Sequence, residues 1–183
     1  MKKIFIFAFA SAIFSLSASA QKTVMVGGAA MYPSKNIVEN AVNSKDHTTL
    51  VAAVQAAGLV DALKGAGPFT VFAPTNAAFD MLPAGTVDNL LKPENKAALQ
   101  DVLKYHVVSG KWDANSLKKM IRKNNGKATI TTLAGGKLYA SLDKNGGIWL
   151  WDENGGKAMV TISNVNQSNG VIHVVDHVLL PKM

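Results

Sequence analysis

The spacing of apolar residues divides the chain into a helical N-terminal part and a strand-rich C-terminal part. From residue 36 to 125, apolar side chains mostly recur three or four positions apart, as they do on one face of a helix. This spacing predicts helices at or near residues 37–42, 47–57, 59–63, 76–82, 87–91, 97–104 and 115–125. The run Phe69–Ala73 is apolar and rich in β-forming residues, so it predicts one buried strand among the helices.

After residue 127 the pattern changes to short apolar runs separated by turn residues. Glycine pairs and Asn-Gly pairs stand between the runs, and such pairs are typical of β-hairpin turns. The runs predict antiparallel strands at residues 128–133, 137–142, 148–151, 159–165 and 171–180. Because helices and strands are segregated along the chain, the predicted fold class is α+β rather than a doubly wound sheet.

The first twenty residues follow a different pattern. Lys2 and Lys3 precede an almost wholly apolar run, Ile4–Leu16, and Ala18 and Ala20 then form an A-x-A site. This order predicts a secretory signal peptide over residues 1–20, cleaved after Ala20. The apolar run is short for a membrane span of about 20 residues. We therefore expect an exported protein, periplasmic or extracellular.

The rest of the chain is predicted to be one domain behind a short leader. Residues 21–34 contain two adjacent glycines and a Tyr-Pro pair, which predict an irregular leader, and residues 35–183 have the length of a single domain. No second apolar stretch is long enough to span a bilayer. The 183 residues include no cysteine, which excludes disulfides, thiolate metal sites and cysteine catalysis.

The remaining polar residues give no catalytic or metal-binding pattern. There is no G-x-S-x-G motif, and the adjacent pair Asp152-Glu153 is expected at the surface beside a glycine turn. His173 and His177 would lie about 13 Å apart on a strand, which is too far to share one metal ion. The sequence predicts no enzyme, no cofactor and no metal site.

Charge adds one candidate contact surface. The formal net charge is +7, and the lysines are scattered except on the predicted helix 115–125. There Lys118, Lys119, Arg122 and Lys123 share one face and form a compact basic patch. The patch is either a solvated helix face or a surface that attracts anionic polysaccharide, lipopolysaccharide or another envelope surface. Few aromatic residues lie near it, so we do not expect nucleic acid as a partner.

Two tryptophans offer a second candidate surface. Trp149 and Trp151 alternate with Ile148 and Leu150 in a predicted strand, so both indoles share one side of it. Because all four residues are apolar, either side could face the interior, and we expect at least one tryptophan in the core. If both indoles were exposed, they would form a stacking platform for sugar rings.

Three segments together resemble a known family. They are G-P-F-T-V-F-A-P-T-N-A-A-F at residues 67–79, L-K-Y-H-V-V-S-G at residues 103–110 and N-G-V-I-H-V-V-D at residues 169–176. In this order and at these separations they resemble the signatures of the fasciclin (FAS1) domain family, in its secreted single-domain bacterial form. The resemblance covers most of residues 46–181.

The resemblance implies a wedge-like fold, with an antiparallel, β-sandwich-like core and the N-terminal helices packed alongside. It implies an exported, non-enzymatic module that adheres to a cell-surface or matrix component such as a polysaccharide. Tyr105 and His106 correspond to the segment implicated in integrin binding by animal fasciclin domains. An acidic motif of those domains is replaced here by Asn164-Val165, so integrin binding is not expected. The alternative is a periplasmic small-ligand or glycan-binding protein that uses Trp149 and Trp151.

Overall fold

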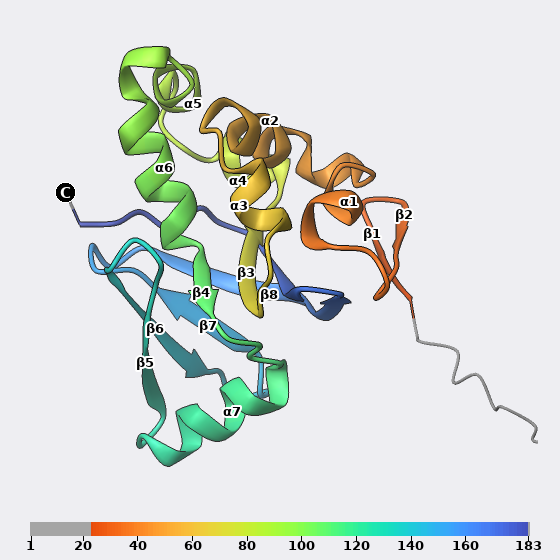
Figure 1. The fold of residues 1–183 in the computed structure, drawn as a ribbon. Helices are drawn as coiled ribbons and strands as arrows, with labels where there is room; N and C mark the ends of the chain where they lie inside the picture. The colour runs from red at the N-terminus through yellow and green to blue at the C-terminus, as the bar shows by residue number, and fades with distance from the viewer. Residues whose placement is uncertain (1–22, 183) are drawn as a thin grey trace, which may run out of the picture.

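The computed structural model describes residues 23–182, and the predicted signal peptide lies outside them. Seven α-helices are present among these residues: α1 (Ile37–Ala41), α2 (Thr48–Ala56), α3 (Val60–Lys64), α4 (Asn76–Asp80), α5 (Thr86–Leu90), α6 (Lys96–Tyr105) and α7 (Ala114–Lys123). Short 3-10 turns at Lys45–His47 and Pro93–Asn95 precede α2 and α6. Figure 1 shows α1–α6 gathered on one side of the molecule and α7 at the opposite end.

The strands form a two-stranded hairpin and one large sheet. Their bounds are β1 (Val24–Val26), β2 (Ala29–Met31), β3 (Phe69–Pro74), β4 (Val107–Ser109), β5 (Lys127–Thr131), β6 (Lys137–Leu142), β7 (Ile148–Trp151), β8 (Lys157–Gln167) and β9 (Gly170–Val175). The large sheet has the order β4-β3-β9-β8-β7-β6-β5. Its neighbours are antiparallel except for β3 and β9, which run parallel. The α+β class with a mostly antiparallel sheet is confirmed.

Strand β8 joins the two halves of this sheet. It has eleven residues and pairs with β7 at its start and with β9 towards its end. The register with β9 shifts between Val160 and Ile162 and again between Ile162 and Val165. Such irregularities bend a strand and increase its twist, which lets one sheet curve around a core. Helix α7 packs on β5 and β6 at the far end of the curved sheet.

The interior consists of three apolar clusters. The first lies between the β5–β8 half of the sheet and α7, the second between β3, β9 and the β1–β2 hairpin, and the third between α2 and α6. Strand β3 contributes to two of them, because Phe72 belongs to the first cluster while Val71 and Ala73 belong to the second. A strand covered on both faces reads as a continuous apolar run, as Phe69–Ala73 does.

The prediction of an irregular leader is wrong for residues 24–31, which form the β1–β2 hairpin. Its turn, Gly27-Gly28, has positive φ at both residues, a conformation that glycine adopts without strain. Val26 and Met31 are buried in the second cluster. The Asn40 side chain accepts a hydrogen bond from the Tyr32 amide and donates one to its carbonyl. The hairpin is therefore part of the folded domain.

Within residues 23–182, no helix is both long enough and apolar enough to cross a bilayer.

Candidate functional site

The Tyr105-His106 pair lies in the interior. The exposed fractions are 0% for Tyr105 and 3% for His106. Nδ1 of His106 is 2.8 Å from the carbonyl oxygen of Val102, and Nε2 is 3.0 Å from the Leu179 amide that donates to it. Burial lowers the pKa of His106 to about 4, although the Val102 carbonyl and the Asp152 charge oppose this. The ring is therefore neutral at pH 7 and holds the backbone of two segments together.

Tyr105 also connects backbone segments. Its hydroxyl donates to the Lys137 carbonyl at 2.6 Å and accepts from the Glu153 amide at 3.3 Å. Burial is the main reason why the pKa of Tyr105 rises to about 12. The prediction that Tyr105 and His106 contact a partner directly is wrong for this structure, because neither side chain reaches the surface. The sequence pattern could not show this, since a Tyr-His pair between apolar residues occurs both in protein interiors and on surfaces.

The two tryptophans lie on the solvent side of β7. Ile148 and Leu150 are buried in the first cluster, so the alternation of the strand turns Trp149 and Trp151 outward. Trp151 is 37% exposed and Trp149 is half-buried. The expectation that at least one tryptophan belongs to the core is therefore wrong. The inner side of the strand holds the smaller aliphatic residues, which pack in one cluster with Leu117 and Ile121 of α7.

Neighbouring strands add further aromatic and basic side chains to this side of the sheet. In the antiparallel register, Trp151 stands opposite Tyr139 of β6 and opposite Lys157 of β8, while Trp149 stands opposite Ser141. Partners in directly opposed positions have side chains close enough to touch. We call the surface formed by Lys127, Tyr139, Ser141, Trp149, Trp151 and Lys157 the aromatic face.

Lysines flank the rings of the aromatic face. The Lys127 ammonium is 4.4 Å from the centre of the Tyr139 ring. The Lys157 ammonium is 5.4 Å from the Trp149 ring and 6.0 Å from the Trp151 ring. Cations at such distances are attracted by the negative face of an aromatic ring. The face thus combines flat apolar rings with positive charge.

Hydrogen bonds fix the two indoles on the sheet. Trp151 Nε1 donates to Ser141 Oγ at 3.1 Å, and Trp149 Nε1 donates to Asp143 Oδ2 at 3.2 Å. The Asp143 carboxylate also accepts from the amides of Gly147 and Asn145 in the β6–β7 turn. These bonds lower the pKa of Asp143. The bond from the Gly147 amide has the largest effect, and the bond from Trp149 has the next largest. The rings are held in place before any ligand arrives.

Three of the four residues of the basic patch are exposed on α7. Ala114, Leu117 and Ile121 form the buried side of α7, and Asp113 caps its N-terminus by accepting from the Ser116 amide at 2.7 Å. Lys119, Arg122 and Lys123 are exposed, and Lys118 is half-buried. Lys118 Nζ lies near Gly146 of the β6–β7 turn. The patch therefore begins beside the turn that orients Trp149.

The aromatic face could have been found in part from sequence. In K-L-Y-A-S-L at residues 137–142, the large apolar Leu138 and the small Ala140 alternate with Tyr139 and Ser141. The structure buries Leu138 and Ala140 and places Tyr139 and Ser141 outside. The lysines at 127 and 157 could not be assigned, because their contact with the rings depends on which strands are neighbours.

His173, His177 and Asp152 make contacts within the fold. His173 is buried, and its Nε2 donates to the Trp112 carbonyl at 2.8 Å, while the exposed His177 contacts Asp176. Asp152 was expected at the surface, but it is buried and accepts from the Asn154, Gly156 and Leu180 amides. Across the described residues, no group of three or more His, Asp or Glu could hold a metal ion.

Comparison with known proteins identifies the fold. Residues 45–181 match the family model of the fasciclin domain. The chain belongs to the fasciclin domain family. Protein sll1483 of Synechocystis is 46% identical over 163 residues, which are 89% of this chain and 83% of that protein. Immunogenic protein MPB70 of Mycobacterium bovis is 34% identical, over 77% of this chain and 66% of its own length.

Some of the similar proteins are much longer than this chain, which matches only a part of each. Human periostin is 32% identical over 74% of this fasciclin domain chain but over only 15% of periostin. A solved FAS1 domain pair from the insect cell adhesion molecule fasciclin I superposes with a TM-score of 0.69 and 18% identity. The match covers 80% of this chain and 51% of that one. It confirms the predicted FAS1-like fold.

Proposed function

We propose that this fasciclin domain is an exported, non-enzymatic adhesion module that binds polysaccharide of a cell surface or matrix through its aromatic face. One observation carries the proposal. Tyr139, Trp149 and Trp151 stand on adjacent strands, on the solvent side, with lysine ammonium groups over their rings. The predicted signal peptide supports export, and the likeness to a domain pair of an insect cell adhesion molecule supports adhesion.

The chemistry of the aromatic face suits sugar rings. The carbon-bound hydrogens of a pyranose ring form an apolar surface, which stacks on the flat face of an indole and leaves the hydroxyl groups in water. Because the indoles are held by Asp143 and Ser141, little side-chain freedom is lost on binding. The face lies on an open sheet, so an extended polymer can cross it and repeat weak contacts along its length.

The lysines favour an anionic polymer. Lys127 and Lys157 carry positive charge beside the rings, and the basic patch on α7 starts at the neighbouring β6–β7 turn. Exposed charges attract over about 10 Å at 0.1 M salt and over about 3 Å at 1 M. A polymer of uronic acids would therefore bind through stacking and charge together, whereas a neutral polymer would bind through stacking alone.

The test compares binding of the purified chain to alginate, a polyuronate, and to dextran, a neutral glucan, at low and high salt. The variant Trp149→Ala/Trp151→Ala should weaken alginate binding at least about tenfold, since two stacked rings are lost. Tyr32→Ala is the matched control, because Tyr32 is an exposed aromatic residue outside the aromatic face. Undiminished alginate binding by a folded double variant would refute the proposed face.

A further inference from the structure

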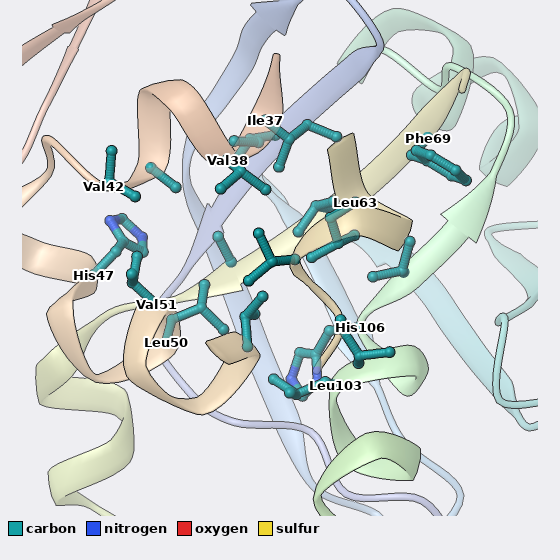
Figure 2. Close-up of a pocket in the computed structure, with 18 of the residues that line it drawn as sticks. Ile37, Val38, Val42, His47, Leu50, Val51, Leu63, Phe69, Leu103 and His106 are labelled. Carbon is teal, nitrogen blue, oxygen red and sulfur yellow. The ribbon is translucent and has the colours of Figure 1, made fainter. Parts of the chain in front are cut away.

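A second feature of the molecule lies among the N-terminal helices. Between α1, α2 and α3 on one side and β3 on the other is a cavity of about 520 Å³. Val26 and Met31 of the β1–β2 hairpin contribute to its wall. Figure 2 shows Val38, Leu50, Val51 and Leu63 around it. We call this cavity the helical pocket.

The helical pocket is lined by residues of both the second and the third apolar cluster. Leu50 and Leu63 pack at the edge of both clusters, and the cavity remains between their helices and β3. Protein interiors are normally packed as densely as organic crystals, with few voids larger than a water molecule. Small-molecule sites, in contrast, measure about 300–1,000 Å³ and are lined mainly by apolar groups. The helical pocket has the size and the apolar lining of a small-molecule site.

The helical pocket has few polar lining residues, among them two neutral histidines and two charged lysines. His47 and His106 line it, and burial lowers the pKa of both rings, so they are neutral at pH 7. His47 Nδ1 bonds to Ser44 Oγ at 2.8 Å. The charged lining residues in the described chain are two lysines, Lys64 and Lys104, and no Asp or Glu lines the pocket.

Two lysines, Lys64 and Lys104, are among the residues that line the helical pocket. Each directly follows a leucine, Leu63 or Leu103, that packs in the third cluster. Figure 2 places Leu63 and Leu103 towards one side of the pocket and His47 with Val42 towards the other. Within the described residues, neither ammonium has a carboxylate within 4 Å. The pocket is thus an apolar cavity whose lining, within the described residues, includes two lysines and no acidic residue.

We propose that the helical pocket binds a single-chain amphiphile with an anionic head group, its aliphatic chain among the valines and leucines and its head at Lys64 and Lys104. The head can be a carboxylate or a phosphate, since a lysine ammonium binds either as a point charge. The apolar lining excludes a polar sugar, and the absence of acidic lining residues excludes a cationic head. Val42 and Leu133, which are 52% and 46% exposed, mark where the pocket reaches the surface.

The probes are four twelve-carbon compounds, each below its micelle concentration: laurate, dodecyl phosphate, dodecanol and dodecyltrimethylammonium. Titration calorimetry on the purified chain should give one saturable site for laurate or dodecyl phosphate. The stronger of the two identifies the head group as carboxylate or phosphate. Dodecanol should bind about fivefold more weakly because it lacks the attraction to the lysines, and dodecyltrimethylammonium more weakly still.

Two kinds of variant locate the site. Val38→Trp and Val51→Trp each place an indole in the pocket from a different helix, α1 or α2, and both positions are only half-buried. Each folded variant should lose at least about tenfold in laurate affinity. Lys64→Ala/Lys104→Ala should weaken laurate about fivefold and leave dodecanol unchanged. The matched control is Lys92→Ala/Lys111→Ala, which removes two exposed lysines outside the pocket.

Three results would overturn the proposal. The first is that neither anionic probe shows saturable binding to the folded wild-type chain. The second is that laurate binds equally well to both folded tryptophan variants, which would place it elsewhere. The third is that dodecyltrimethylammonium binds as tightly as laurate, which would remove the role of the lysines. The Trp149→Ala/Trp151→Ala variant should bind laurate as the wild type does, so this test is independent of polysaccharide binding.

Discussion

Nε2 of His106 accepts a hydrogen bond of 3.0 Å from the amide of Leu179, a residue 73 positions further along the chain. The other ring nitrogen, Nδ1, is 2.8 Å from the Val102 carbonyl. One neutral imidazole with its proton on Nδ1 satisfies both backbone groups. A protonated ring would carry a second N–H on Nε2, which would then face the N–H of Leu179. The bond therefore couples the end of α6 to the C-terminal segment only while His106 is neutral.

This coupling predicts a loss of stability in acid. The folded chain holds the pKa of His106 at about 4, below its usual 6.5, so the unfolded chain binds more protons between these values. The stabilisation is fully present above pH 6.5 and is lost as the pH falls towards 4. It amounts to at most about 3–4 kcal/mol, at 1.36 kcal/mol for each pKa unit. Urea unfolding at pH 7, 5.5 and 4.5 should show the decrease.

A histidine variant separates this effect from general acid sensitivity. His106→Gln should be less stable at pH 7 but should lose less stability on acidification than the wild type. Burial also lowers the pKa of His47 and His173, so a smaller acid effect should remain. His177→Gln, at an exposed position, should retain the full dependence on pH. If His106→Gln and the wild type lost equal stability, His106 would not be the main titrating group.

The Tyr105 hydroxyl can be tested without disturbing the packing of its ring. Tyr105→Phe removes the bonds to the Lys137 carbonyl and the Glu153 amide. The lost bonds and the unsatisfied carbonyl should cost about 1–3 kcal/mol, measured by urea unfolding. Alginate binding at 25 °C should be unchanged, because this side chain is buried. A large loss of binding in a folded Tyr105→Phe chain would instead support a contact role for the Tyr-His segment.

Local patterns were enough to predict the fold class, since apolar periodicity and glycine turns depend on residues close in sequence. They could not predict the parallel pairing of β3 with β9, because Phe69 pairs with Gly170 a hundred positions away. For the same reason the hairpin at residues 24–31 was missed. Three-residue strands are too short to show alternation, and their burial depends on contacts with distant elements.

The aromatic face shows a second limit of prediction from sequence. In I-W-L-W at residues 148–151, alternation indicates which side chains share a face but not which face is inside, because both sets are apolar. The choice depends on the space beneath α7, where Ile148 and Leu150 fit. The basic patch was easier to predict, since three small or aliphatic residues on α7 leave only one side for the charges.

Two aspartates in similar turns provide a comparison of a buried and a half-buried carboxylate. Asp143 and Asp152 each begin a D-x-N-G-G turn and accept from the amides two and four residues later. Only Asp152 is buried, and it also accepts from the Leu180 amide at 3.0 Å. Asp152→Ala should therefore cost about 2–4 kcal/mol, and Asp143→Ala distinctly less. Thermal and urea unfolding of the two variants, under identical conditions, measure the difference, and equal losses would contradict it.

The β1–β2 hairpin can be tested with two methionines from the same hairpin. Met31 is 2% exposed and packs in the second cluster, whereas Met25 is 60% exposed. Met31→Ala should cost about 2–4 kcal/mol by removing buried apolar volume, and Met25→Ala should change stability by less than about 0.5 kcal/mol. If both substitutions were neutral in urea unfolding, the hairpin would contribute nothing to the folded domain, as the sequence-based prediction of a leader supposed.

The basic patch should affect association at low salt without affecting the fold. Replacing Lys118, Lys119, Arg122 and Lys123 by alanine leaves the buried side of α7, with Leu117 and Ile121, intact. The free energy of unfolding should therefore stay within about 1 kcal/mol of the wild type, while binding to alginate at 20 mM salt should fall several-fold. At 1 M salt the charges are screened, so the variant and the wild type should bind equally through the aromatic face.

The matched control for the basic patch is Lys92→Ala/Lys111→Ala, which removes charge from exposed positions off α7. This double variant lowers the net charge without touching the patch, so any loss of binding that it shows measures the effect of total charge alone. We expect its loss at 20 mM salt to be less than half that of the patch variant. Equal losses per charge removed would mean that the patch acts only through net charge. A deficit that persisted at 1 M salt would mean that α7 touches the polymer directly, because a purely electrostatic attraction does not survive such screening.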